Sequence, residues 1–236
     1  MPLGTLSRPA APSAVRRYAL GVVPGMLRIR RRLAPLILLV ALIVVACQTA
    51  APFSPTGPCN GDGHEAGAYP ELEALAPKAF DGKPPTTLDS GRNCSDEALG
   101  SLVSHGVHEL RFAGATWDFG NGHAMTIAVL GLPDAALPVA WAEEFYELGA
   151  RNAKKTEHVE VTRPDLAPVG LVFRLDTLND LSFQTVVVWA EDQRVRVVIV
   201  ASPVNAAASR ADHDALVASA VATAAAGPTA QAGAGG

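Results

Sequence analysis

The chain is poor in positive charge. Its 236 residues carry 19 Lys and Arg against 23 Asp and Glu, for a net charge of −4, and no basic patch or arginine stripe remains beyond the first thirty-two residues. Proteins that bind nucleic acid neutralise phosphates with such patches. We therefore expect no nucleic-acid partner for the main part of the chain.

The sequence also lacks the short motifs that carry well-known chemistries. It contains no GxSxG nucleophile turn, no GxxxxGK[ST] or GxGxxG phosphate loop and no HExxH zinc helix. The tripeptide Asp118-Phe119-Gly120 occurs without the glycine-rich loop, strand lysine and HRD loop of a protein kinase, so we interpret it as a coincidence. We predict a protein that is not an enzyme and has no cofactor.

His105 and His108 form the strongest metal signal in the chain. Two histidines three residues apart can share one helix face, but a zinc site needs three or four ligands, and no matching cysteine pair is present. His64, His123 and His158 could complete such a site only by converging through the fold. We predict no metal site, and an extracytoplasmic hydrolase built on His105 and His108 is an alternative.

No apolar run is long enough to cross a bilayer comfortably. The run from Leu33 to Ala46 falls short of the about 20 residues that a spanning helix needs. Four arginines within residues 28–32 precede it, and it ends in Val44-Val45-Ala46-Cys47, an order typical of a secretory signal. Residues 28–48 resemble the signal peptides of bacterial lipoproteins, which implies cleavage before Cys47 and transfer of a diacylglyceryl group to its thiol.

An uncleaved signal anchor, with Cys47 as an ordinary thiol, is the alternative. Residues 1–25 are long for a signal, whereas Met26 would open one of ordinary length, so translation starting at Met26 is a further hypothesis. Under the lipoprotein interpretation, residues 1–46 are leader and signal peptide. The mature chain is then lipid-anchored at the extracytoplasmic face of a bacterial membrane, and residues 47–68, rich in Pro, Gly, Ala and Thr, form a flexible tether.

Only three cysteines are present, and two remain once Cys47 is assigned to the lipid. In an oxidising compartment a leftover pair usually forms a disulfide, so we predict a bridge between Cys59 and Cys94. The spacing of about 35 residues without a CxxC motif disfavours metal binding by this pair. The bridge would hold the end of the tether to the folded domain.

The folded part, residues 69–226, shows alternating helix and strand patterns. Asp134 is predicted to cap the strongest helix, in which Trp141 and Phe145 are expected to face the core. Val195, Val197 and Ile199 are expected to face the core from a strand whose other face meets water or the tether. Other helices are predicted over residues 70–80, from a cap at Ser95, and from a cap around Asp212; strands are predicted over 123–132 and in four runs between 156 and 202.

These patterns predict an α+β fold, with an antiparallel sheet of about four to six strands and helices packed on one face. The order of elements and the opening phrase "LEALAP" resemble small extracytoplasmic domains of uncharacterised bacterial lipoproteins that begin with an "LExLLP" helix. The resemblance covers about Tyr69 to Ala226 and implies a lipid-anchored α+β domain without catalytic residues. Residues 227–236 are expected to be disordered.

The sequence therefore favours a noncatalytic binding domain anchored to the membrane. Its expected partner is a protein, an envelope polymer or a small apolar ligand. A hydrolase with an unrecognised site and a structural or assembly factor of an envelope complex are the other hypotheses. A deep apolar pocket between sheet and helices would favour a small ligand, whereas a closed core would favour a protein partner.

Overall fold

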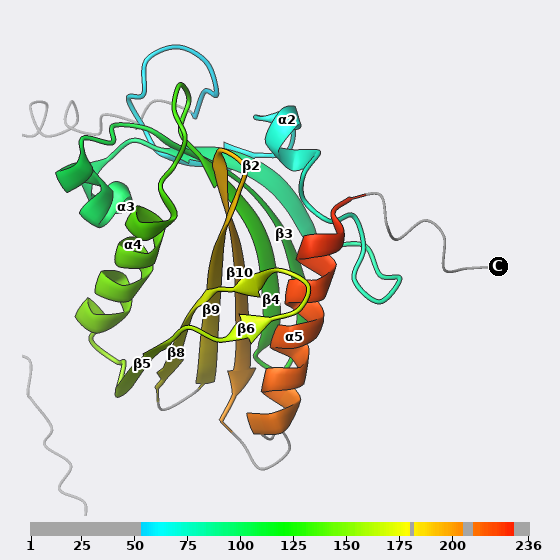
Figure 1. Cartoon of the computed structure of the whole chain (residues 1–236). Coiled ribbons are helices and arrows are strands. Elements are labelled where there is room, and N and C mark those ends of the chain that lie inside the picture. Colours follow the sequence, from blue (N-terminus) through cyan, green and yellow to red (C-terminus); the bar gives the residue numbers. More distant parts are fainter. Residues whose placement is uncertain (1–52, 180–181, 205–209, 229–236) are drawn as a thin grey trace, which may run out of the picture. The chain divides into compact units, whose positions relative to one another are not determined.

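A computed structural model of the chain describes residues 53–179, 182–204 and 210–228. Within them, eight strands form one antiparallel sheet in the order β1-β2-β3-β4-β10-β9-β8-β5, and β6 and β7 form a separate small hairpin (Figure 1). The strands are β1 Gly63–Glu65, β2 Thr87–Asn93, β3 Leu110–Gly120, β4 His123–Gly131, β5 His158–Thr162, β6 Asp165–Leu166, β7 Gly170–Leu171, β8 Phe173–Leu178, β9 Ser182–Glu191 and β10 Arg194–Pro203.

Tight turns join the central strands. The β3–β4 hairpin turns at Asn121 and Gly122, whose φ angles of 53° and 83° lie in the left-handed region that this dipeptide adopts readily. The β9–β10 hairpin turns at Asp192, with a φ of 53°. Runs of valine in β9 and β10 favour extended backbone, because β-branched side chains pack well on a pleated surface.

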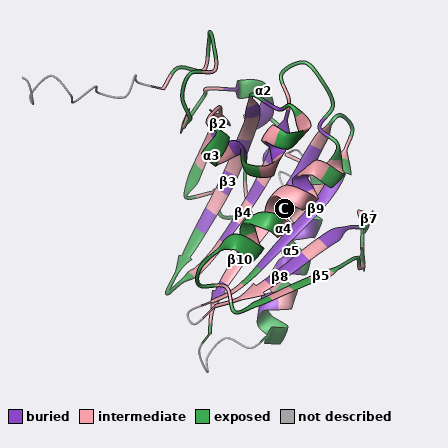
Figure 2. Cartoon of the chain, turned by 90° about the vertical axis from the view of Figure 1, so that its left-hand side faces the viewer, coloured by how far each residue is buried: buried purple, intermediate pink, exposed green. Residues whose placement is uncertain are grey.

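Both faces of the central strands are buried (Figure 2). Val195 and Val197 of β10 pack in the cluster beneath α4 (Val139–Asn152), whereas Val198 and Val200 pack in the cluster beneath α5 (Arg210–Ala226). Side chains alternate between the faces of a strand, so the two helices cover opposite faces of the sheet, as Figure 1 shows. The shorter helices are α2 Pro70–Glu73, α3 Asp96–Leu99 and the 3₁₀ helix η2 Gly100–His105.

The α+β class is confirmed, but two details of the predicted architecture are wrong. The sheet has eight strands instead of four to six, and helices lie on both faces instead of one. The prediction that one face of β10 meets water or the tether is also wrong, because Val198 and Arg196 on that face are fully buried. The Arg196 guanidinium is satisfied there by the Leu75 carbonyl oxygen at 2.9 Å and by the carboxylate of Glu191.

The predicted helices are present with shifted boundaries. α4 begins at Val139 after Pro138, not at a cap on Asp134, because the backbone N–H of Leu137 donates to the Gln193 carbonyl and holds this segment extended. α5 begins at Arg210, before the predicted cap around Asp212, and α2 ends at Glu73, short of the predicted 80. The Ser95 cap is confirmed, since its hydroxyl accepts the Ala98 N–H.

The predicted tether over 47–68 is too long. Residues 53–68 belong to the fold: β1 pairs with β2, and the Tyr69 hydroxyl donates to the Pro55 carbonyl at 3.0 Å. Cys47, the leader and residues 229–236 of the tail lie outside the described residues. Among the helices that the structure describes, none is both long and apolar enough to cross a membrane.

Candidate functional site

A cavity of about 570 Å³ opens between α4 and the face of the sheet that this helix covers. We call it the α4 cavity. Its floor is formed by Leu175 of β8, Val186 of β9 and Ile199 of β10. Its outer wall is the second half of α4, from Phe145 to Asn152, and its remaining side is the junction of α3 and η2. The size lies within the range of about 300–1,000 Å³ seen for small-molecule sites.

Glycine shapes the junction of α3 and η2 beside the cavity. Gly100 has a φ of 52°, which other residues rarely adopt, and a Cβ atom there would lie 3.3 Å from the Phe145 ring. A Cβ atom on Gly149 of α4, which also lines the cavity, would meet no heavy atom within 4 Å. Gly100 therefore lets the backbone pack closely against Phe145, whereas the space around Gly149 is open.

Two hydroxyl groups interrupt the apolar lining. Ser101 Oγ is buried without a hydrogen-bond partner among the described residues. Burial raises the pKa of the Tyr146 phenol to about 12, and no hydrogen bond to its hydroxyl is found in the part of the chain that the structure describes. Buried polar groups are nearly always paired, so the buried Ser101 hydroxyl is suited to meeting a polar atom of a bound molecule or water, whereas Tyr146 is only half-buried.

The rim of the cavity is polar. Thr177 of β8 and Gln184 of β9 are opposite each other in the strand pairing, and Asn152 and Thr156 follow from the end of α4. Glu97 of α3 adds a carboxylate. An apolar interior with a hydrogen-bonding rim is the arrangement that holds and orients a small amphipathic molecule.

On the opposite face of the same strands, four buried groups form a hydrogen-bonded chain. His213 Nδ1 lies 2.9 Å from Ser202 Oγ, and His213 Nε2 lies 2.7 Å from Thr185 Oγ1. The Thr185 hydroxyl donates to the Asp176 carboxylate, so it accepts from His213 Nε2, and His213 Nδ1 accepts from Ser202. We call this chain the His213 relay. Ser202 is only 2% exposed, so this arrangement does not present a nucleophile to a substrate.

Charged groups of β8 and α5 surround the relay. Burial lowers the pKa of His213, and the nearby Arg210 guanidinium lowers it further. Burial opposes ionisation of Asp176, but hydrogen bonds from Arg174 and Thr185 outweigh it and hold the pKa of the carboxyl below its ordinary value. The relay therefore contains a neutral imidazole connected through a hydroxyl to a carboxylate.

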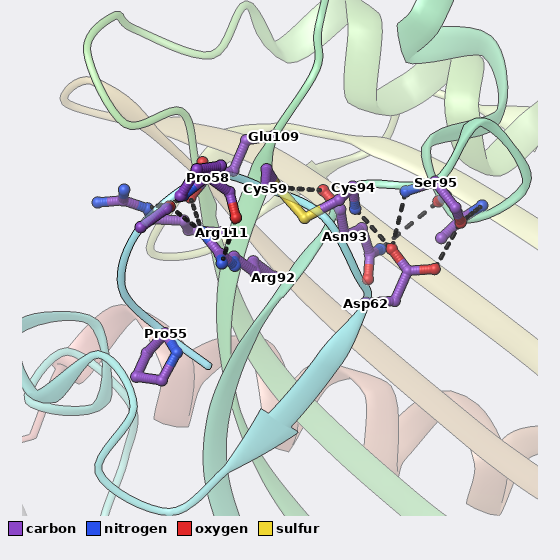
Figure 3. Close-up of a disulfide and its surroundings, with 12 residues drawn as sticks. Pro55, Pro58, Cys59, Asp62, Arg92, Asn93, Cys94, Ser95, Glu109 and Arg111 are labelled. Carbon is purple, nitrogen blue, oxygen red and sulfur yellow. Dashed lines mark hydrogen bonds and ion pairs between the residues drawn. A yellow bond between two sulfur atoms is a disulfide. The ribbon is translucent and has the colours of Figure 1, made fainter. Parts of the chain in front are cut away.

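The predicted disulfide between Cys59 and Cys94 is present, with Cα atoms 5.4 Å apart (Figure 3). Arg92 reinforces it by donating to the Gly57 and Pro58 carbonyls at 3.1 and 3.0 Å. Asp62 accepts the backbone N–H of Cys94 at 2.5 Å and also bonds Ser95. Burial raises the pKa of Asp62, but these hydrogen bonds outweigh it and give a lowered value.

The structure does not bring His105 and His108 together as ligands. His105 Nε2 lies 2.9 Å from Glu144 Oε2, and its ring stacks on Trp141 with centroids 4.5 Å apart. His105, Trp141 and His108 line one hollow of about 350 Å³, apart from the α4 cavity, and the structure, which describes both imidazoles, shows no hydrogen bond between them. Within the described residues, no group of three His, Cys, Asp or Glu side chains is arranged to hold a metal ion. Trp141 and Phe145 pack against the core as predicted, but both remain partly exposed.

Sequence reasoning missed the α4 cavity and the His213 relay. Tyr146 and Ser101 have no motif around them, and His213 follows Asp212 in what reads as an ordinary helix start. A helix pattern predicts which face is apolar, but it cannot show that the face stands away from the sheet. Comparison with known proteins adds nothing: no family model matches the chain, and neither a curated protein nor a solved structure is significantly similar to it.

Proposed function

We propose that this protein is a lipid-anchored binding protein of the extracytoplasmic face of a bacterial membrane, and that the α4 cavity holds a small amphipathic molecule. The cavity is the observation that carries the proposal. A closed core between helix and sheet would have favoured a protein partner, whereas a hollow of about 570 Å³ is of the size that a small ligand occupies.

The cavity lining indicates the chemistry of the ligand. Apolar side chains of α4 and of three strands form most of the surface, so the larger part of the ligand is apolar. Burying such a ligand gains about 25 cal/mol per Å² of apolar surface removed from water. The buried, unpartnered hydroxyl of Ser101 favours a ligand that also carries at least one hydrogen-bonding group.

The proposed anchor would keep the domain close to the membrane. The six chain steps from Cys47 to Phe53, the first described residue, span at most about 20 Å when fully extended. The disulfide and the Arg92 contacts fix the chain to the fold directly after this segment. A domain whose first described residue is held this close to the lipidated cysteine would stay near amphipathic molecules that partition into lipid.

Gly149 offers a test that leaves the core untouched. Gly149 lines the cavity, and leucine at this position would add a large side chain to the lining, whereas alanine would add one carbon. Both substitutions remove a helical glycine, which is worth about 1 kcal/mol in helix stability, so the two variants are matched in fold stability. The full-length protein in detergent micelles is titrated with the neutral fluorescent probe N-phenyl-1-naphthylamine.

We expect wild type and Gly149→Ala to bind the probe equally, and Gly149→Leu to bind at least about tenfold more weakly, a loss of about 1.4 kcal/mol. A titration of protein-free micelles measures the binding of the probe to the micelles themselves. If all three proteins give the same titration, the α4 cavity is not the binding site and the proposal is wrong.

A further inference from the structure

The α4 cavity and the His213 relay lie on opposite faces of the same pair of strands. In the β8–β9 ladder, Asp176 is opposite Thr185, and both side chains belong to the relay. The neighbouring pairs, Leu175 with Val186 and Thr177 with Gln184, line the cavity. Because adjacent residues of a strand face opposite ways, any displacement of the relay pair acts directly on its cavity-lining neighbours.

We propose that protonation of His213 weakens ligand binding in the α4 cavity, so that the domain holds its ligand at neutral pH and releases it on acidification. This inference rests on the proposed function. It adds the regulation of the cavity by a group that does not contact the ligand.

The directions of the hydrogen bonds explain why protonation disturbs the relay. His213 Nδ1 accepts the Ser202 hydroxyl proton, and protonated Nδ1 becomes a donor instead. The Ser202 hydroxyl must then turn to accept, and its own proton loses the imidazole acceptor. The Thr185 hydroxyl already accepts a hydrogen bond from His213 Nε2 and donates one to Asp176. It therefore cannot replace the lost Ser202 hydrogen bond without giving up one of its own.

The charges around His213 act on its protonation in both directions, because Arg210 and Arg174 lower its pKa whereas Asp214 and Asp176 raise it. The groups that act on it are Arg210 and Asp214 of α5 and Arg174 and Asp176 of β8. Both carboxylates are already paired with the arginines: Arg174 contacts Asp176 and Asp214, and Arg210 contacts the same two residues. Burial disfavours the charged imidazole most, and the two carboxylates, which are already paired with arginines, do not outweigh it, so the pKa of His213 stays lowered.

The position of the relay makes a local response possible. Asp176 lies near the end of β8, which stops at Leu178, and Thr185 lies near the start of β9 at Ser182. Strand ends open at lower free-energy cost than the centre of a sheet. A second hollow, of about 420 Å³, lies against Asp176 and Arg210 and gives the relay a route for protons from solvent.

The test uses full-length protein in micelles, N-phenyl-1-naphthylamine as the probe, and protein-free micelles as the background. Probe affinity is measured from pH 7.5 to pH 5.0, with near-ultraviolet circular dichroism recorded at each pH to follow the fold. His213→Gln removes the titrating group and retains a donor toward Thr185. His158→Gln is the matched control, because His158 is an exposed histidine at the same end of the sheet.

We expect the dissociation constant of wild type and of His158→Gln to rise at least about threefold on acidification, and that of His213→Gln to stay constant. By reciprocal linkage, saturation with probe should lower the pKa of His213, followed by NMR of its imidazole, by at least about 0.5 pH unit. This second measurement decides the matter if His213→Gln does not fold.

Two results would overturn the inference alone: pH-independent probe binding in wild type, or an unchanged pH dependence in His213→Gln. An unchanged His213 pKa in the probe-saturated protein would do the same. A wild-type protein that fails to bind the probe at pH 7.5 contradicts the proposed function itself, so the two failures are distinguishable.

Discussion

Removing the Cys59–Cys94 disulfide should destabilise the domain without abolishing the fold. The bridge joins residues 35 apart in the sequence. In the chain-entropy treatment, closing a loop of that length restricts the unfolded chain by about 12–13 cal/mol/K, or about 3.8 kcal/mol at 25 °C. Because Asp62 and Arg92 hold the same segment through hydrogen bonds, the segment should stay docked in the native state, and most of the loss should come from the freer unfolded chain.

The assay is urea unfolding of the Cys59→Ala, Cys94→Ala double variant beside wild type. With a urea dependence of about 2–3 kcal/mol/M, the midpoint should fall by about 1.3–2 M, and the slope should increase because the uncrosslinked chain exposes more surface. Reduction of wild type should reproduce the shift. A midpoint within about 0.3 M of wild type would refute the reasoning, since it would mean that the bridge barely restricts the unfolded chain.

Four further outcomes are expected. Trp117→Ala should lower the free energy of unfolding by about 3–5 kcal/mol in thermal or urea unfolding, because Trp117 is 2% exposed. Trp141→Ala should lower it by about 1–2 kcal/mol, because Trp141 is only partly buried, and equal losses would contradict this ranking. The pKa of His213 lies below its ordinary 6.5, so its contribution to stability is complete above pH 6.5. The free energy of unfolding should fall as pH drops below that value, and a free energy that does not change with pH would contradict this. The pKa of Asp176 lies below 3.8, so this carboxylate should stabilise the fold above that pH and lose its contribution as pH falls through its pKa in the folded protein. Asp176→Asn should therefore lose the most stability at neutral pH, and an equal loss at about pH 2 would contradict this. Cys47→Ala should abolish labelling by a fatty-acid probe, and unchanged labelling would disprove lipidation at this residue.

The strands with strong β-forming composition could be predicted from the sequence, and those of small residues could not. β4, β9 and β10 consist largely of valine, isoleucine and other apolar residues, so their patterns stand out. β3, with the sequence LRFAGATWDFG, has alanine at two fully buried positions, Ala113 and Ala115, and glycine between them at a half-buried one. Its hairpin turn, Asn121-Gly122, was a usable signal, because this dipeptide favours a two-residue β-turn.

The number of buried faces was harder to predict than the strands themselves. Arg196 in β10 reads as solvent-facing, because an isolated charge is costly to bury. In the fold, the Leu75 carbonyl and the Glu191 carboxylate satisfy it, and Leu75 lies about 120 residues away in the chain. Pairing between such distant segments leaves no local pattern. The disulfide could be predicted because oxidation constrains two leftover cysteines wherever they lie.

The most direct test of the central claim is to identify what the α4 cavity carries in the cell. Full-length Gly149→Ala and Gly149→Leu proteins are purified in parallel, extracted with organic solvent, and compared by mass spectrometry at equal protein amounts. We predict a small amphipathic molecule that is enriched with Gly149→Ala and depleted with Gly149→Leu, whose side chain would add bulk to the cavity lining. Identical extracts, together with no binding of amphipathic probes by either variant, would contradict a ligand-binding role for the cavity.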